Sequence, residues 1–162
     1  GVDIVELTGD CDSIMFCLSK GLASPVGSII AGTKVFIKEA RRIRKMLGGV
    51  MRQTGILAAC GIISLEEMID RLAEDHDNAR YLANGLEGID GFSINLKTVQ
   101  TNIVCFKFEL PNLSCKEFVG NVTKKGVYVV HLYKDSGRMV THMDLNRSDV
   151  DYALEVFKDS VF

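Results

Sequence analysis

The stretch Ser13-Ile-Met-Phe-Cys-Leu-Ser-Lys20-Gly-Leu-Ala-Ser-Pro-Val-Gly-Ser28 decides how this chain folds around its candidate site. It opens with an apolar run that has the length of a short strand buried on both faces. A glycine and a proline then indicate a turn, and a second apolar run of strand length follows. We therefore predict two strands, over residues 13–18 and 27–31. Lys20 lies at the mouth of this strand pair.

A lysine in this place has two interpretations. In the more common one, its stem packs on the strand end while its ammonium group reaches water. In the other, a partly desolvated amine with a lowered pKa is a nucleophile toward carbonyl groups and can hold an aldehyde cofactor as a Schiff base. Three small neighbours, Ser19, Gly21 and Ala23, leave room for a cofactor beside the amine and favour this second interpretation.

The segment Cys17-Leu-Ser-Lys20-Gly-Leu-Ala-Ser-Pro-Val-Gly-Ser28 closely resembles the cofactor-lysine segment of the low-specificity L-threonine aldolases. These are pyridoxal 5'-phosphate (PLP) enzymes of the aspartate-aminotransferase fold type, also called fold type I. In that family the lysine of this motif binds the cofactor covalently, and Lys20 stands at the matching position. The resemblance continues over nearly the whole chain and matches the C-terminal half of the family.

The resemblance implies an α/β fold with an α+β C-terminal part. We expect residues 1–88 to form the end of the large cofactor-binding domain, and residues 89–162 to form the small α+β sandwich domain. The opening segment, 2–7, alternates weakly and predicts an extended segment or a loop. Beyond the lysine strands, the periodicity predicts a long helix that ends near Gly88, and then a strand, a helix, two strands and a helix. The spans predicted for these last five elements are 101–108, 114–125, 127–132, 138–141 and 148–161.

The composition is that of an ordinary globular protein. The 162 residues are 47% apolar and 25% charged, with a formal net charge of −2, which argues against a general nucleic-acid or membrane electrostatic role. No apolar stretch reaches the roughly 18 to 20 residues of a membrane span. The five cysteines include no close Cys-x-x-Cys pair, so we expect no metal or disulfide framework and a cytoplasmic setting. The chain lacks an initiator methionine, and we expect it to open inside a longer protein.

A strongly basic helix is predicted after the second strand. Thr33 can cap it, and apolar residues follow at helical spacing until Gly48 and Gly49 end the run. A face of this kind is most often simply solvated, and two more specific alternatives are a nucleic-acid patch and binding of a small anion such as phosphate. Against the single acid Glu39, the helix carries Lys34, Lys38, Arg41, Arg42, Arg44 and Lys45.

The segment 48–53, Gly-Gly-Val-Met-Arg-Gln, sharpens the anion interpretation. It is a glycine turn that leads into an apolar segment, 56–65, predicted as a buried helix, and such a turn offers free backbone N–H groups to an anion. It resembles the Lys-Met-x-Gly-Gly-Gly-Met-Arg-Gln segment of the threonine aldolases, in which the arginine reaches a cofactor phosphate across the subunit interface. The resemblance implies cofactor-binding roles for Arg52 and Lys45. Val50 departs from the third glycine of the family.

Arg138 is the candidate substrate-binding residue. It follows a predicted turn, Asp-Ser-Gly at 135–137, and opens a strand, where an arginine is usually a surface charge. The alternative is a fork that binds a carboxylate through two parallel hydrogen bonds. The segment 138–151, Arg-Met-Val-Thr-His-Met-Asp-Leu-Asn-Arg-Ser-Asp-Val-Asp, resembles the end of the threonine aldolases, where an arginine holds the amino-acid carboxylate. The resemblance assigns that role to Arg138, and we assign no chemistry to His142 or Asp144.

The function implied by the resemblance is a PLP-dependent aldolase that cleaves L-threonine or L-allo-threonine to glycine and acetaldehyde, as a homodimer or homotetramer. Lys20 is its catalytic residue. The base for the substrate hydroxyl, the group stacked on the cofactor ring and the acid at its pyridine nitrogen are expected N-terminal to Lys20, where only nineteen residues are present. We therefore expect this fragment to be inactive alone. The alternatives are another fold type I PLP enzyme and a non-catalytic remnant or interaction domain.

Overall fold

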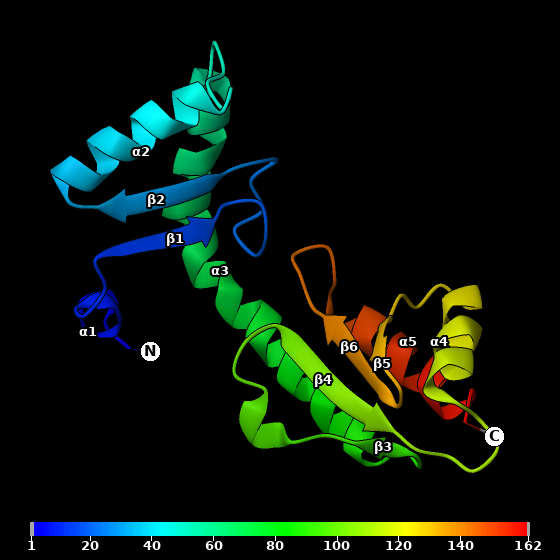
Figure 1. The fold of residues 1–162 in the computed structure, drawn as a ribbon. Coiled ribbons are helices and arrows are strands. Elements are labelled where there is room, and N and C mark those ends of the chain that lie inside the picture. The colour runs from blue at the N-terminus through cyan, green and yellow to red at the C-terminus, as the bar shows by residue number, and fades with distance from the viewer. Residues whose placement is uncertain (1, 162) are drawn as a thin grey trace. The chain divides into compact units, whose positions relative to one another are not determined.

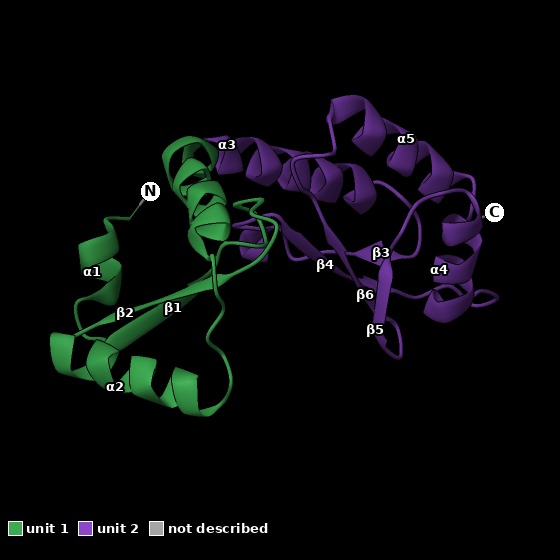
Figure 2. Cartoon of the chain, turned by 90° about the horizontal axis from the view of Figure 1, so that it is seen from above, with its two compact units in different colours: residues 1–70 green, residues 71–162 purple. Residues whose placement is uncertain are grey.

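The structure is a computed structural model that describes residues 2–161. The chain forms two compact units, residues 1–70 and residues 71–162 (Figure 2). Helix α3, Gly55–Glu87, runs through the division and contributes to both units. The predicted domain boundary follows the last residue of α3, whereas the two units divide inside this helix.

The first unit contains the predicted strand pair. Strands β1, Ser13–Cys17, and β2, Ser28–Gly32, pair antiparallel over their whole length (Figure 1). The chain connects them through the segment that carries Lys20, as predicted. The prediction that the first of these strands is buried on both faces is wrong for this chain, because Met15 of β1 is 63% exposed.

Helix α2, Lys34–Met46, follows β2 directly and confirms the basic helix. The Thr33 side chain accepts a hydrogen bond from the Phe36 N–H at 3.2 Å, which satisfies one of the free donors at the helix start. Gly32 leaves space for the Phe36 ring, since a Cβ at this glycine would lie 2.8 Å from the ring. This contact fixes the start of α2 against the end of β2.

The opening segment is helical, so the prediction of an extended segment or loop over residues 2–7 is wrong. Helix α1 spans Ile4–Thr8 and begins where the Asp3 carboxylate accepts a hydrogen bond from the Val5 N–H at 2.7 Å. An aspartate in this capping position stabilises a short helix that is too brief to show a periodic apolar pattern.

Helix α3 joins two segments that the sequence suggested separately. Its first part confirms the predicted helix over 56–65, but this part is not buried, because Ile56, Ile62 and Ile63 are each more than half exposed. Its second part packs tightly, with Ala79, Leu82 and Leu86 among the buried residues. No helix within residues 2–161, α3 included, is both long enough and apolar enough to span a membrane.

The second unit is a four-stranded antiparallel sheet with the order β3-β4-β6-β5, packed against helices. The predicted small α+β sandwich is therefore confirmed. The two-residue strand β3 and a 3-10 turn, η1 at Leu96–Thr98, were not predicted, and β6 starts two residues before the predicted strand. The strands are β3 (Phe92–Ser93), β4 (Ile103–Phe108), β5 (Val130–Tyr133) and β6 (Ser136–Val140).

The core lies on one face of this sheet. Val104, Phe106 and Phe108 of β4 are buried and alternate with three exposed residues, which is the pattern of a strand with one solvated face. Against this face pack the second part of α3 and the helices α4, Cys115–Lys124, and α5, Arg147–Lys158 (Figure 1). The Phe108 and Phe118 rings stack with their centroids 4.5 Å apart.

Both of the last two helices begin with a capping box, which the sequence analysis did not predict. Ser114 and Glu117 exchange side-chain and backbone hydrogen bonds at the start of α4, and Asn146 and Asp149 do the same at the start of α5. The hydrogen bonds from Ser114 lower the pKa of Glu117.

Candidate active site

The chain around Lys20 is held in a compact loop by its own backbone. The Leu18 N–H donates to the Gly27 carbonyl at 2.9 Å, which extends the β1–β2 pairing past the strand end. The Ala23 N–H donates to the Lys20 carbonyl at 2.9 Å and the Ser24 N–H to the Leu18 carbonyl at 3.0 Å. Ala23 has a φ of +56°, a left-handed conformation that residues with a Cβ adopt mainly in tight turns. Lys20 therefore sits at the first position of a defined turn.

Two contacts fasten this loop to α3. The Leu18 side chain, 8% exposed, lies over Gly61, where a Cβ would come within 3.1 Å of its Cδ1. The buried Ser64 hydroxyl donates to the buried Ser24 hydroxyl at 3.0 Å. The loop is thus fixed on both sides of Lys20 by residues some 40 positions away in the sequence, which no local pattern could reveal.

Lys20 itself is exposed. The partial desolvation that we expected for a nucleophilic amine is therefore not present within this chain. No hydrogen bond or ion pair among residues 2–161 engages its ammonium group, and the small residues Ser19 and Gly21 flank it. The geometry is that of an exposed amine on a hydrogen-bonded turn.

The segment from Lys45 to Arg52 differs from the prediction in one respect. The Gly48 and Gly49 N–H groups are not free for an anion, because they donate to the Lys45 and Arg44 carbonyls at 3.1 and 2.8 Å and so end helix α2. Gly48 has a φ of +75°, as glycines that end helices commonly do. Helix α3 begins at Gly55, after a loop rather than at the glycine pair.

Arg52 and Lys45 are both exposed. Within the part of the chain that the structure describes, no ion pair or hydrogen bond engages either side chain. Both cations are therefore available for an anionic group, and the arginine, not the glycine backbone, is the donor that this segment offers.

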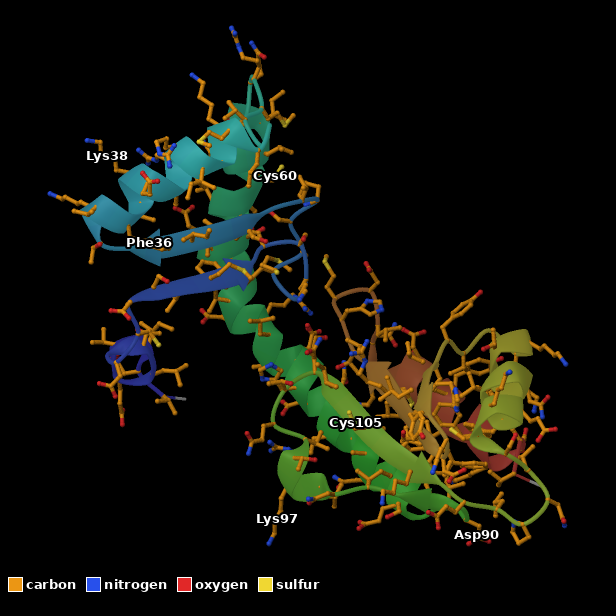
Figure 3. The ribbon with its side chains drawn as sticks, in the orientation of Figure 1. Phe36, Lys38, Cys60, Asp90, Lys97 and Cys105 are labelled. Atoms are coloured by element: carbon orange, nitrogen blue, oxygen red, sulfur yellow. The ribbon has the colours of Figure 1, made fainter. Side chains whose placement is uncertain are left out.

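Arg138 lies on the central strand β6, opposite Cys105 of β4 and Val130 of β5. It shares the sheet face opposite the core with the exposed Cys105, which Figure 3 labels on β4. Its Nε is buried yet has no hydrogen-bond partner within the described residues. A buried guanidinium N–H without an acceptor is costly, and a carboxylate placed against the fork would satisfy it.

A polar clamp that the sequence did not predict holds the end of β6. Thr141, 1% exposed, donates its hydroxyl to the Asp75 carbonyl of α3 at 2.6 Å and its N–H to the Asn102 carbonyl at 3.0 Å. The Asn102 amide returns a hydrogen bond to the Thr141 carbonyl at 2.8 Å. The clamp lies three residues from Arg138, so it fixes the strand that carries the guanidinium.

Three of the four predicted site residues, Lys20, Lys45 and Arg52, belong to the first unit, and Arg138 belongs to the second. Thr141 lies within the segment 138–151 that resembles the aldolases, but the sequence predicted no role for this threonine. Its signal would have been a threonine followed by a histidine directly after a strand, which is too common to single out.

Known proteins resemble this chain over nearly its full length. Low-specificity L-threonine aldolase 1 from Arabidopsis thaliana is 36% identical over 162 residues, which are 99% of this chain and 45% of that protein. The low specificity L-threonine aldolase of Escherichia coli K12 is 39% identical over 150 residues, 93% of this chain and 43% of that protein. The chain therefore spans less than half the length of these curated relatives, and the predicted resemblance to threonine aldolases is confirmed.

Solved structures confirm the fold. The serine palmitoyltransferase of Sphingomonas wittichii superposes with a TM-score of 0.77 at 17% identity, covering 96% of this chain and 41% of that protein. A related structure, of SPT with PLP, superposes with a TM-score of 0.74. These are fold type I enzymes, and the coverage agrees with a chain that forms part of such a fold. The family model described as beta-eliminating lyase matches residues 1–109, and the chain belongs to that family.

Proposed function

We propose that this chain is part of a PLP-dependent aldolase that cleaves L-threonine or L-allo-threonine to glycine and acetaldehyde. The observation that carries the proposal is Lys20, an exposed and unengaged amine on a turn that backbone hydrogen bonds and α3 hold in place. The names of the relatives at 36% and 39% identity support the choice of substrate class. Because the chain spans less than half of those relatives, the activity is proposed for the whole protein.

The residues fit a phosphorylated aldehyde cofactor. Lys20 would hold PLP covalently, with the small side chains beside it leaving space for the ring, and Arg52 and Lys45 would pair with the phosphate. When bound, PLP supplies an electron sink for the electrons released at the substrate Cα. Lys20 would hold the cofactor whenever no substrate amine is bound to it.

Arg138 would bind the substrate carboxylate. Its buried and unpartnered Nε supplies one N–H of the fork, and the Thr141 clamp limits the movement of β6. Holding the carboxylate fixes rotation about the bond from the amine to Cα, so the Cα–Cβ bond can be set perpendicular to the cofactor ring. Arg138 therefore acts by orienting the bond that breaks.

Quaternary structure and cellular location complete the proposal. We place the whole protein in the cytoplasm as a homodimer or homotetramer, in which Arg52 reaches the cofactor phosphate of a neighbouring subunit. The exposed, unpaired state of Arg52 supports an acceptor outside its own chain, and five free cysteines suit a reducing compartment.

A second candidate is another PLP-dependent reaction on the same fold. The likeness to serine palmitoyltransferase supports it, because the same lysine could serve a different bond cleavage. Similarity of fold at 17% identity does not distinguish the two candidate reactions. A substrate assay is needed to distinguish them.

The test uses the protein expressed from its complete gene and purified with PLP. Borohydride reduction followed by peptide mapping should find the pyridoxyl group on Lys20. Lys20→Ala should abolish both this label and the release of acetaldehyde from L-allo-threonine, while Lys38→Ala, on the exposed face of α2, should leave both unchanged. A label on another residue, or none, would contradict the role of Lys20. A labelled protein that releases no acetaldehyde would favour the second candidate.

A further inference from the structure

A cavity of about 310 Å³ lies between β2 and α2 and is lined by two arginines. Its walls are regular structure. From β2 come two residues that are two positions apart and so share a strand face. From α2 come four residues at spacing i, i+3, i+4 and i+7, which is one face of a helix. The lining residues are Ser28, Ile30, Ile37, Ala40, Arg41 and Arg44.

The positive charge of this cavity is not compensated by a neighbouring acid. Arg41 and Arg44 are neighbours on the helix surface, where like charges repel. The one acid of α2, Glu39, is already bound by Arg42, whose Nε lies 2.9 and 3.0 Å from the two carboxylate oxygens. Within residues 2–161, no ion pair engages Arg41 or Arg44. An anion in the cavity would relieve their repulsion.

The turn that ends α2 lies beside the stem of Arg44. The Gly49 N–H donates to the Arg44 carbonyl at 2.8 Å, and a Cβ at Gly49 would lie 3.0 Å from Arg44 Cγ. Glycine at this position therefore leaves the arginine stem its space.

We propose that this cavity, the α2 anion site (Ser28, Arg41 and Arg44), binds a compact dianion of the phosphate class. Two guanidinium forks match the oxygens of a phosphate. The Ser28 hydroxyl adds a donor, since among residues 2–161 it donates to the Cys17 sulfur alone, at 3.6 Å. The volume is at the lower end of small-molecule pockets, which suits inorganic phosphate or a phosphoryl group better than a nucleic-acid strand.

The test measures binding of inorganic phosphate by calorimetry at low ionic strength, with the protein expressed from its complete gene. The double variant Arg41→Ala/Arg44→Ala is compared with Lys34→Ala/Lys38→Ala, which removes the same charge from the same helix without touching the cavity. Lys38 extends from α2 on the side away from β2 (Figure 3). We expect the arginine pair to weaken binding by about tenfold or more, and the lysine pair by less than about threefold.

Two further controls separate this site from other sources of phosphate binding. The protein is loaded with PLP before the titration, because the phosphate contacts proposed for Arg52 and Lys45 are then occupied. Arg41→Lys/Arg44→Lys keeps the charge but removes the forks, and should weaken binding as well. Equal losses in the arginine and lysine pairs, or no saturable binding by the unaltered protein, would each overturn the proposal.

Discussion

At the scale of single residues, Arg138 is a predicted site residue with a buried polar atom that no described residue satisfies. It lies on a central strand, and its Nε is buried without a partner. Surface arginines rarely leave a buried N–H unsatisfied, because the cost is about 1–3 kcal/mol. A carboxylate on the guanidinium fork would remove this cost, which is why a substrate-binding role suits the residue better than a surface charge.

We predict that Arg138→Lys in the complete protein raises the KM for L-allo-threonine by about 10- to 100-fold, while PLP binding is retained. Lysine keeps the charge but replaces two parallel hydrogen bonds by one, a loss of about 1.5–3 kcal/mol. Steady-state kinetics measures the KM, and the PLP absorbance measures cofactor content. The control is Arg80→Lys, at an exposed arginine of α3. An unchanged KM in Arg138→Lys would remove this residue from the substrate site.

Thr141 is the second residue whose environment predicts a measurable effect. Thr141→Val keeps the shape but removes the hydroxyl that donates to the Asp75 carbonyl at 2.6 Å. The Asp75 carbonyl lies inside α3, where it also accepts the helical hydrogen bond from the N–H four residues later. It is therefore not left without a donor in the variant. We therefore expect the free energy of unfolding to fall by about 1 kcal/mol, the net value of one hydrogen bond.

Chemical denaturation measures the effect of Thr141→Val, with Thr123→Val as its control. The Thr123 hydroxyl also donates to a backbone carbonyl, that of Val119 at 2.7 Å, but within a single helix turn. Such back-bonding adds little stability, so the control should change by less than about 0.5 kcal/mol. If the two variants behave alike, the link between α3 and β6 contributes nothing beyond a local bond.

At the scale of elements, two glycines inside helices provide a matched test of packing. A Cβ at Gly85 of α3 would lie 2.5 and 2.7 Å from the two Cδ atoms of Leu154 in α5, whereas a Cβ at Gly120 of α4 would meet nothing within 4 Å. Gly120→Ala should therefore stabilise the protein by about 0.5–1 kcal/mol, the usual gain in helix propensity. Gly85→Ala should be less stable than Gly120→Ala by about 1–3 kcal/mol, because Leu154 must move.

Thermal and chemical denaturation of both glycine variants measure this difference. Far-UV circular dichroism confirms that each variant keeps its helix content. Equal stabilisation by the two alanines would mean that α3 and α5 are not in the close contact that the structure describes.

The elements that the sequence predicted well are those with local signals. Helix α2 was predicted from its Thr33 cap and its terminal glycines, and helices α4 and α5 from the periodicity of the sequence. Helix α1 was missed because five residues show no period, and β3 because two residues show no alternation. Local rules find an element only when it is long enough to repeat its pattern.

The candidate site was predictable only in part for the same reason. The turn at Lys20 follows from its neighbouring glycine and proline, and the motif resemblance singled out Lys20, Arg52 and Arg138. The contacts that support these residues join distant positions, such as Ser24 with Ser64 and Thr141 with Asp75. A pairing across 40 or 66 positions has no local sequence signature, so only the folded chain reveals it.

At the scale of the whole molecule, the two units differ sharply in how much apolar surface they bury. Leu18 is the one buried apolar side chain described within residues 2–70, whereas the core of the second unit contains seventeen buried residues. The burial that apolar runs predicted for β1 and for the start of α3 therefore does not occur in this chain. Burial depends on the whole protein, and this chain spans less than half the length of its curated relatives.

This contrast predicts unequal local stability in the 162-residue chain. Burial of apolar area is the main source of stability, and regions with few buried contacts open at a lower free energy than the core. We expect backbone amides of β4 and α5 to exchange with deuterium far more slowly than those of β1 and β2. The difference in opening free energy should be a few kcal/mol, which corresponds to about 100-fold or more in protection.

Native-state hydrogen exchange resolved by mass spectrometry or NMR measures this difference. The internal control is the pairing itself, because β1 and β2 form a complete five-residue antiparallel ladder. If hydrogen bonding alone set the protection, the amides of β1 and β2 would be protected as strongly as those of β4 and β6. If protection depends on a buried core, the amides of β1 and β2 would exchange faster. Equal protection in the two sheets would show that the hairpin carrying Lys20 is stable without further cover. Weak protection that rises in the complete protein would show that the Lys20 turn depends on the rest of the enzyme for its rigidity.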